Sequence, residues 1–230
     1  MIESVFFDLD GLLADTEELH IIAYEDVAKK TGIAMSRGYI QSFIGRATKE
    51  NIWQIIQDFN ITSFSFEELL QLRYDSYGEV IQRVPIALME GALVCIERVA
   101  AQNLRRALVT LSMKEQALSV LENISKNLKR DSNDGGINLV EFFHTMVFGN
   151  EVSRPKPDPE IYLEALKRTG MAPVRCVALE DSEVGVISAK RAGLYVIAVP
   201  NVHTKQQNFE MADLVYPSLR EVAKMEFLNL

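Results

Sequence analysis

Two acidic pairs are the residues of this chain whose types and spacing best suit chemistry. Asp8 and Asp10 follow an apolar run near the N-terminus, and Glu180 and Asp181 follow another apolar run. Side chains two residues apart in extended backbone leave on the same side, so Asp8 and Asp10 can share a cation. Carboxylates of this kind hold Mg2+, which keeps several of its waters. Taken alone, each pair has a simpler interpretation. The first can be part of an Asp-Gly turn, and the second can supply the N-cap of a helix.

A lysine between two prolines is the third candidate. Lys156 stands in the segment RPKPDPE, where Pro155 and Pro157 restrict its backbone. Asp158 and Pro159 are typical of an N-cap followed by the first residue of a helix. The lysine is therefore held more firmly than a surface lysine, and it can neutralise an anionic oxygen. A solvated loop lysine is the alternative interpretation.

These candidates must be positioned by a sheet. Apolar, β-rich runs without alternation are separated by helical patterns, which predicts buried parallel strands in a doubly wound, Rossmann-like α/β core. The runs span residues 4–8, 106–112, 145–150, 176–181 and 195–201. Ligands bind beyond the carboxyl ends of such strands. We therefore expect the residues that end the runs to converge, namely Asp8, Asp10, Thr110, Ser112, Glu180 and Asp181.

The long connection between the first two runs predicts an inserted helical domain at residues 15–90, with the core formed by 1–14 and 91–230. Its expected helices span residues 16–31, 47–58 and 66–83, and Gly32 would end the first. A polar stretch at 125–138 is expected to be a solvated loop.

Composition limits the class of protein. The chain has 230 residues, 48% of them hydrophobic and 24% charged, which is typical of a globular fold. A net charge of −8 argues against nucleic acid or an anionic membrane surface as a partner. No secretory signal or spanning segment is expected. Cys95 and Cys176 lie among apolar neighbours, which favours buried thiols and a reducing, cytoplasmic setting.

The order of these features resembles the four motifs of the haloacid dehalogenase superfamily. They read FFDLDGLLADTE, LVTLS, RPKPDP and ALEDSEVGVISAKRAG. The resemblance covers essentially the whole chain, because the insert is similar to the helical cap of that superfamily. DLDGLLADTEELH is similar to the branch that contains β-phosphoglucomutase and phosphoglycolate phosphatase.

The resemblance implies a role for each core residue. Asp8 would be the nucleophile, and Asp10 would protonate the leaving oxygen and then activate water. Thr110, Ser112 and Lys156 would contact the transferring phosphoryl group. The expected reaction is hydrolysis of a small phosphorylated metabolite.

The resemblance also implies Mg2+ as the cofactor. Asp8, the Asp10 carbonyl, and Glu180 or Asp181 would hold it. Dehalogenases of the superfamily need no magnesium and typically lack the second aspartate of the first motif. The presence of Asp10 therefore argues against carbon–halogen chemistry.

Residues of the insert bear on the choice between hydrolysis and isomerisation. His20 matches a histidine of the β-phosphoglucomutase group, although a packed or solvated helix histidine is an alternative. In the mutases an arginine aligns with Thr48, and here Arg46 and Lys49 stand nearby. This departure favours a phosphatase over a sugar phosphate mutase. A non-catalytic binding protein of the same fold is a further alternative, and the substrate and the oligomeric state stay open.

Overall fold

The computed structural model describes residues 1–44, 46–131 and 137–227. The chain forms two compact units, each of which is described by itself. The first consists of Met1–Asp15 and Ile86–Leu230, and the second consists of Thr16–Pro85. The sequence analysis placed the corresponding boundaries at residues 15 and 90.

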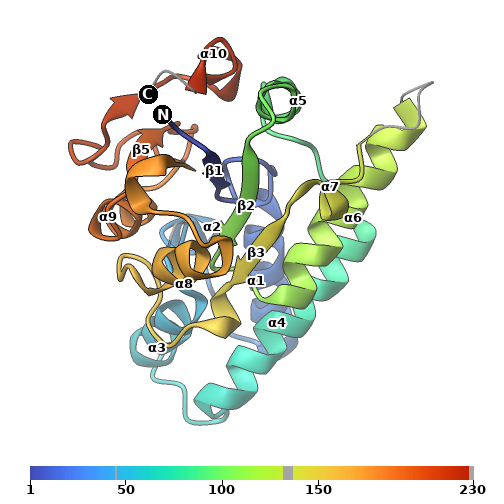
Figure 1. Ribbon diagram of the computed structural model, residues 1–230. Helices are drawn as coiled ribbons and strands as arrows, with labels where there is room; N and C mark the ends of the chain where they lie inside the picture. The colour runs from blue at the N-terminus through green and yellow to red at the C-terminus, as the bar shows by residue number, and fades with distance from the viewer. Residues whose placement is uncertain (45, 132–136, 228–230) are drawn as a thin grey trace. The chain divides into compact units, whose positions relative to one another are not determined.

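A six-stranded parallel sheet forms the centre of the first unit (Figure 1), in the order β3-β2-β1-β4-β5-β6. The strands are β1 (Ser4–Phe7), β2 (Arg105–Thr110), β3 (Thr145–Phe148), β4 (Cys176–Glu180), β5 (Tyr195–Ala198) and β6 (Leu214–Val215). The first five lie within or next to the predicted runs, so the predicted fold class is confirmed. The sequence analysis missed β6, because two residues carry no periodic pattern.

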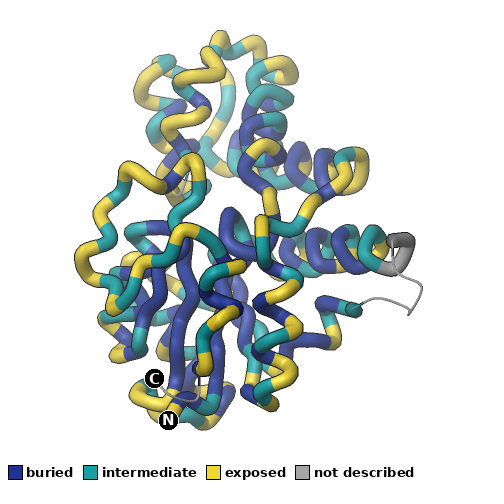
Figure 2. Tube along the Cα trace, turned by 90° about the horizontal axis from the view of Figure 1, so that it is seen from above, coloured by how far each residue is buried: buried dark blue, intermediate teal, exposed yellow. Residues whose placement is uncertain are grey.

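Both faces of the sheet are covered, which explains why its strands read as continuous apolar runs. Neighbouring residues of β1 pack on opposite faces. The Phe6 ring stacks on Tyr162 of helix α8 (Glu160–Thr169), with ring centroids 6.5 Å apart. The Phe7 ring meets Phe142 and Phe143 edge-on. Figure 2 shows the strands as buried segments of the chain.

Helices connect the strands of the first unit. They are α5 (Ala92–Ala101), α6 (Lys114–Asp131), α7 (Leu139–Phe142), α8 (Glu160–Thr169), α9 (Glu183–Arg191) and α10 (Leu219–Val222), with 3-10 turns at Gly149–Glu151 and Pro173–Arg175. The expected loop at 125–138 is wrong in its first half, because α6 continues to Asp131 and buries Ser125. Residues 132–136 lie outside the described residues.

Four helices make up the second unit. They are α1 (Glu17–Thr31), α2 (Arg37–Gln41), α3 (Thr48–Asp58) and α4 (Phe66–Arg83). Three of them agree with the predicted ranges to within one residue at each end, and Gly32 ends α1 at a φ of 73° as expected. The short helix α2 was missed. Apolar residues of all four helices form one core, which includes Ile21, Tyr24, Ile40, Phe43, Ile52, Ile55 and Leu69.

Two further expectations concern cysteine and membranes. Cys95 and Cys176 are buried and free, which confirms that they are structural thiols. Burial raises the pKa of each thiol to about 12. Within the described ranges, no helix combines the length and the apolarity that crossing a bilayer requires.

Candidate active site

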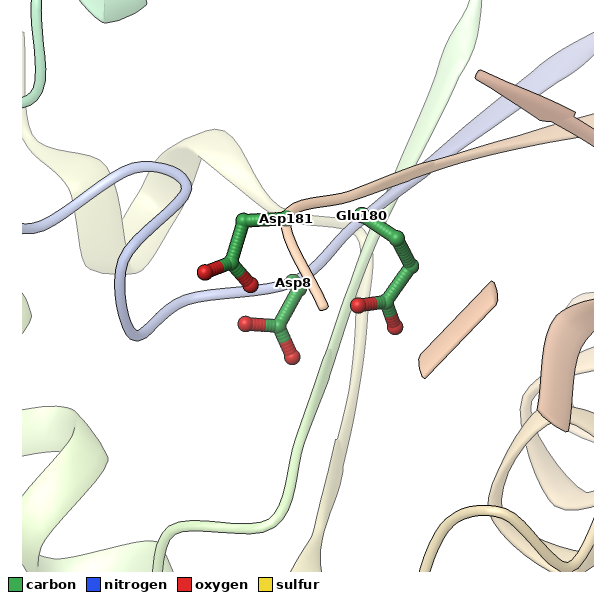
Figure 3. Close-up of side chains that lie close together, drawn as sticks. All are labelled: Asp8, Glu180 and Asp181. Carbon is green, nitrogen blue, oxygen red and sulfur yellow. The ribbon is translucent and has the colours of Figure 1, made fainter. Parts of the chain in front are cut away.

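Asp8, Glu180 and Asp181 meet where the strand order reverses. The chain runs outward from β1 through β2 to β3 and then returns to β4 on the other side of β1. Phe7 pairs with Leu179 across this junction, so Asp8 and Glu180 follow directly on adjacent strands. One carboxylate oxygen from each of the three acids lies within 4.8 Å of the others, and all three residues are buried (Figure 3). This is the crevice in which α/β sheets bind ligands.

The N-cap of α9 explains how Asp181 is placed. Ser182 is the capping residue, and its hydroxyl accepts a hydrogen bond from the Gly185 backbone amide. The N-cap interpretation therefore applies to Ser182 and not to Asp181. The Asp181 carboxylate instead accepts a hydrogen bond of 2.9 Å from Asn201 Nδ2. The same Asn201 amide donates to the Gly11 carbonyl at 3.1 Å, which ties Asp181 to the loop after β1.

Lys156 reaches into the same crevice. Its ammonium donates to Asp8 Oδ1 at 2.6 Å, to Glu180 Oε1 at 2.7 Å and to the Val109 carbonyl at 3.1 Å. An ammonium has three hydrogens, so these acceptors use all of them. The side chain is only 3% exposed, and the interpretation as a solvated loop lysine is wrong.

The segment that carries Lys156 differs slightly from its prediction. Helix α8 begins at Glu160, with Pro159 at the N-cap position, so the helix starts one residue later than expected. Asp158 still acts as a cap, because its Oδ1 accepts a 3.0 Å hydrogen bond from the Glu160 amide. The Lys156–Pro157 peptide bond is cis.

Negative charge exceeds positive charge in the crevice. Burial raises the pKa of Asp8 to about 8, and Glu180 and Asp10 add to the rise while Lys156 opposes it. Burial alone would lower the pKa of the Lys156 ammonium, but Asp8 and Glu180 outweigh burial and hold it above its usual range. One lysine therefore does not neutralise these carboxylates, and each stays charged more easily with a cation nearby.

The donor set of the crevice fits Mg2+. Asp8, Glu180 and Asp181 offer only carboxylate oxygens, the ligand type that Mg2+ prefers. Glu180 Oε2 is buried and has no hydrogen-bond partner among the described residues. A buried charged oxygen without a partner is costly, and a nearby cation would lower that cost.

Asp10 is held by two hydroxyls at the carboxyl end of β2. Thr110 Oγ1 donates to Asp10 Oδ2 at 3.1 Å, and Ser112 Oγ donates to the same oxygen at 2.7 Å. Thr110 Oγ1 also accepts from the Ser112 amide at 3.0 Å, which fixes the orientation of its hydroxyl. Both hydroxyls therefore contact Asp10 directly, an arrangement that the sequence analysis did not foresee.

The predicted site residues of the second unit differ in their local surroundings. The His20 ring stacks on Tyr77 at 4.2 Å, and its Nδ1 lies 2.7 Å from an Arg73 guanidinium nitrogen. Arg73 is buried, and the sequence analysis did not single it out. Arg46 and Lys49 are exposed.

Two residues of the core site were missed by sequence reasoning, namely Tyr162 and Asn201. Asn201 ends the predicted run 195–201, so the rule that strand ends carry the site could have found it. Tyr162 is fully buried on α8, and its hydroxyl donates to Glu180 Oε1. An apolar helix face contains many aromatic residues, and no sequence pattern marks the one whose hydroxyl meets a carboxylate.

Comparison with known proteins places this geometry in a family. The model of the haloacid dehalogenase-like hydrolases matches residues 5–199. The chain is 31% identical to the phosphorylated carbohydrates phosphatase of Thermotoga maritima, over 84% of this chain and 82% of that protein. It is 26% identical to the β-phosphoglucomutase of Bacillus subtilis, over 86% of this chain and 83% of that protein.

Solved structures agree with these relatives. CbbY from Rhodobacter sphaeroides in complex with phosphate superposes with a TM-score of 0.87 at 27% identity, over 100% of both chains. A mutant of the same protein in complex with xylulose-(1,5)bisphosphate gives 0.84 at 26% identity, over 96% of both chains. The resemblance inferred from the motifs is thereby confirmed, and the chain belongs to the haloacid dehalogenase-like hydrolase family of enzymes.

Proposed function

We propose that the chain is a Mg2+-dependent phosphomonoester hydrolase that works through an aspartyl phosphate on Asp8. The observation that carries the proposal is the buried contact between Asp8 and Lys156 beside two further carboxylates, at the switch point of the sheet. Phosphoryl transfer depends mainly on alignment and on neutralisation of oxygen charge. Lys156 and the acidic cluster are the groups that serve these needs.

In the first step, a carboxylate oxygen of Asp8 attacks the phosphorus of the monoester. The bond between phosphorus and the ester oxygen breaks, and Asp10 donates a proton to the leaving alcohol. In the second step, water attacks the phosphorus of the aspartyl phosphate while Asp10 accepts its proton. The bond from phosphorus to Asp8 breaks, which releases inorganic phosphate. The hydroxyls of Thr110 and Ser112 orient Asp10 for both transfers.

Asp8, Asp181 and the Asp10 carbonyl would hold Mg2+, with Glu180 beside them. When bound, the ion supplies positive charge that neutralises the phosphoryl oxygens. Lys156 supplies the remaining positive charge, and its three hydrogen bonds keep it in place before substrate arrives. Thr110 and Lys156 would contact the phosphoryl group itself.

We propose a small phosphorylated sugar or a related metabolite as the substrate. The names of the relatives support this class, since one is a phosphorylated carbohydrates phosphatase and CbbY was solved with a sugar bisphosphate. The unit Thr16–Pro85 would act as the cap, with His20, Arg46 and Lys49 contacting substrate. The buried free cysteines support a reducing, cytoplasmic setting.

A sugar phosphate mutase is the second candidate, favoured by the similarity to β-phosphoglucomutase. A sugar hydroxyl can attack an aspartyl phosphate as water does, so the core residues are compatible with both reactions. Thr48, which stands where the mutases have an arginine, favours the hydrolase. Bidentate contact with a second phosphate needs a guanidinium, which Lys49 lacks and which Arg46 would supply only after a small shift.

The deciding experiment measures phosphate release from a panel of sugar phosphates and other phosphomonoesters, with Mg2+ and with EDTA. A glucose 1-phosphate isomerisation assay runs beside it. We expect release that depends on Mg2+. Isomerisation without release would favour the mutase, and inactivity in both assays would contradict the proposed function.

A further inference from the structure

We propose that Tyr162 is a positioning residue of the phosphoryl-transfer site, whose hydroxyl holds the Glu180 carboxylate so that Glu180 fixes the Lys156 ammonium beside Asp8. This inference rests on the function proposed above. It assigns a role to a residue outside the four motifs, on the helix that covers the sheet.

The Tyr162 side chain has little freedom to move. The residue is fully buried on α8, and its ring lies parallel to that of Phe6, at an interplanar angle of 4°. Its hydroxyl donates to Glu180 Oε1. A buried hydroxyl without a partner is costly, so this hydrogen bond defines where the Glu180 carboxylate lies.

Glu180 is confined from its other side by helix α9. A Cβ atom added at Gly185 would overlap the Glu180 carboxylate, so the carboxylate lies directly against the glycine backbone. Tyr162 therefore holds one oxygen of Glu180, while Gly185 provides the space for the other. The position of Glu180 is set by two helices, of which α8 follows the third motif and α9 lies within the fourth.

Glu180 transmits this constraint to Lys156. Oε1 of Glu180 accepts from both the Tyr162 hydroxyl and the Lys156 ammonium, the latter at 2.7 Å. The other two acceptors of the Lys156 ammonium are the Asp8 carboxylate and the Val109 carbonyl. A shift of Glu180 would consequently move the ammonium relative to Asp8. Lys156 Nζ also lies 5.3 Å from the centroid of the Tyr162 ring.

A neutral hydrogen-bond donor is suited to holding the Glu180 carboxylate. A second lysine or arginine at the position of Tyr162 would attract Glu180 too, but it would also cancel the negative charge that the cation site needs. The phenol donates one hydrogen bond and adds no charge. It therefore orders the carboxylate without changing the electrostatic balance of the crevice.

The test is Tyr162→Phe, which removes the hydroxyl and keeps the ring. Tyr195→Phe is the matched control, because Tyr195 is the first residue of β5, whereas the site lies at the carboxyl ends of the strands. We expect kcat/KM for para-nitrophenyl phosphate at saturating Mg2+ to fall about tenfold or more in Tyr162→Phe, as for loss of a hydrogen bond to a charged group. Unchanged kcat/KM, with or without a lower melting temperature, would overturn the proposal.

A second measurement separates this role from packing and does not depend on turnover. Binding of inorganic phosphate in the presence of Mg2+ is followed by calorimetry in the wild type, Tyr162→Phe, Lys156→Met and the double variant. If Tyr162 acts through Lys156, Tyr162→Phe weakens phosphate binding when Lys156 is present. The same substitution then has no further effect on phosphate binding in the Lys156→Met background. Equal weakening in both backgrounds would refute the proposal. A wild-type protein that releases no phosphate from any monoester would instead refute the proposed function.

Discussion

The Lys156 ammonium lies 2.6 Å from Asp8 Oδ1, and both side chains are buried. Each group therefore depends on the other for its charge, and a neutral group at either position would change the chemistry of the crevice. This pair, together with the cluster around it, leads to five predictions.

Replacing Asp8 with asparagine keeps the shape of the side chain and removes the proposed nucleophile. We expect phosphate release to fall by at least about a thousandfold, because an amide forms no aspartyl phosphate. The circular dichroism spectrum should stay that of the wild type. Asp75→Asn is the control, since Asp75 is exposed on α4 and accepts a hydrogen bond from Gln71 of the same helix. Turnover that survives in a folded Asp8→Asn protein would overturn the mechanism.

Asp181→Ala is expected to raise the Mg2+ concentration needed for half-maximal activity by about tenfold or more, because a ligand of the cation is lost. Asn201→Ala should shift the same concentration by less, since Asn201 acts on the proposed ligand Asp181 through a 2.9 Å hydrogen bond and is not itself a proposed ligand. Titration of activity with Mg2+ measures both effects. If Asp181→Ala needs the same Mg2+ concentration for half-maximal activity as the wild type, Asp181 is not a ligand of the cation.

Ser112→Ala should lower kcat about fivefold, because Asp10 loses the shorter of its two hydroxyl contacts. The matched control is Ser119→Ala on α6, whose hydroxyl donates only to the Glu115 carbonyl of its own helix. Steady-state kinetics on one phosphomonoester compare the two variants. Equal rates in both would mean that the Ser112 contact with Asp10 does not assist proton transfer.

Gly185 and Gly78 allow a matched test of the space behind Glu180. Both are helical glycines, but a Cβ at Gly185 would overlap the Glu180 carboxylate, whereas a Cβ at Gly78 would meet nothing within 4 Å. Gly78→Ala should raise stability by about 0.5–1 kcal/mol, as alanine favours helix. Gly185→Ala should lower the melting temperature and the activity together. A more stable and fully active Gly185→Ala protein would contradict the packing described here.

The stability of the metal-free protein should depend on pH through Asp8. Its pKa lies near 3.8 in an unfolded chain and is raised to about 8 in the folded protein. The folded state thus binds more protons between these values, so the free energy of unfolding falls as pH rises from about 4 to about 8. Each kcal/mol lost from the free energy of unfolding lowers the melting temperature of a chain of this length by roughly 2–4 °C.

Thermal melts in EDTA across this pH range measure the effect. Asp8→Asn should remove this part of the decline, because its side chain does not titrate, and Mg2+ added at pH 8 should raise the melting temperature of the wild type. If the melting temperature falls with pH equally in the wild type and in Asp8→Asn, the titration of Asp8 does not cause the decline.

Local patterns in the sequence were sufficient for β1 to β5, for three of the four described helices of the second unit and for the residues that end the strands. Apolar runs, a glycine after a helix and an Asp-x-Asp spacing each involve a few neighbouring residues, so they can be read without coordinates. The rule that parallel strands present their carboxyl ends together predicts that Asp8, Glu180 and Asp181 meet in one crevice, and the resemblance of the motifs adds Lys156.

The tertiary structure decided which side chains touch within that crevice. Tyr162 and Glu180 are 18 residues apart, and Asn201 and Asp181 are 20 apart. Whether such residues meet depends on which face of the sheet a helix covers and how closely it packs, and no local pattern encodes either. Sequence therefore determined which groups are proposed to react. The packing of α8, α9 and the loop after β5 determined how these groups are held, because hydrogen bonds between distant side chains form only once the layers are in place.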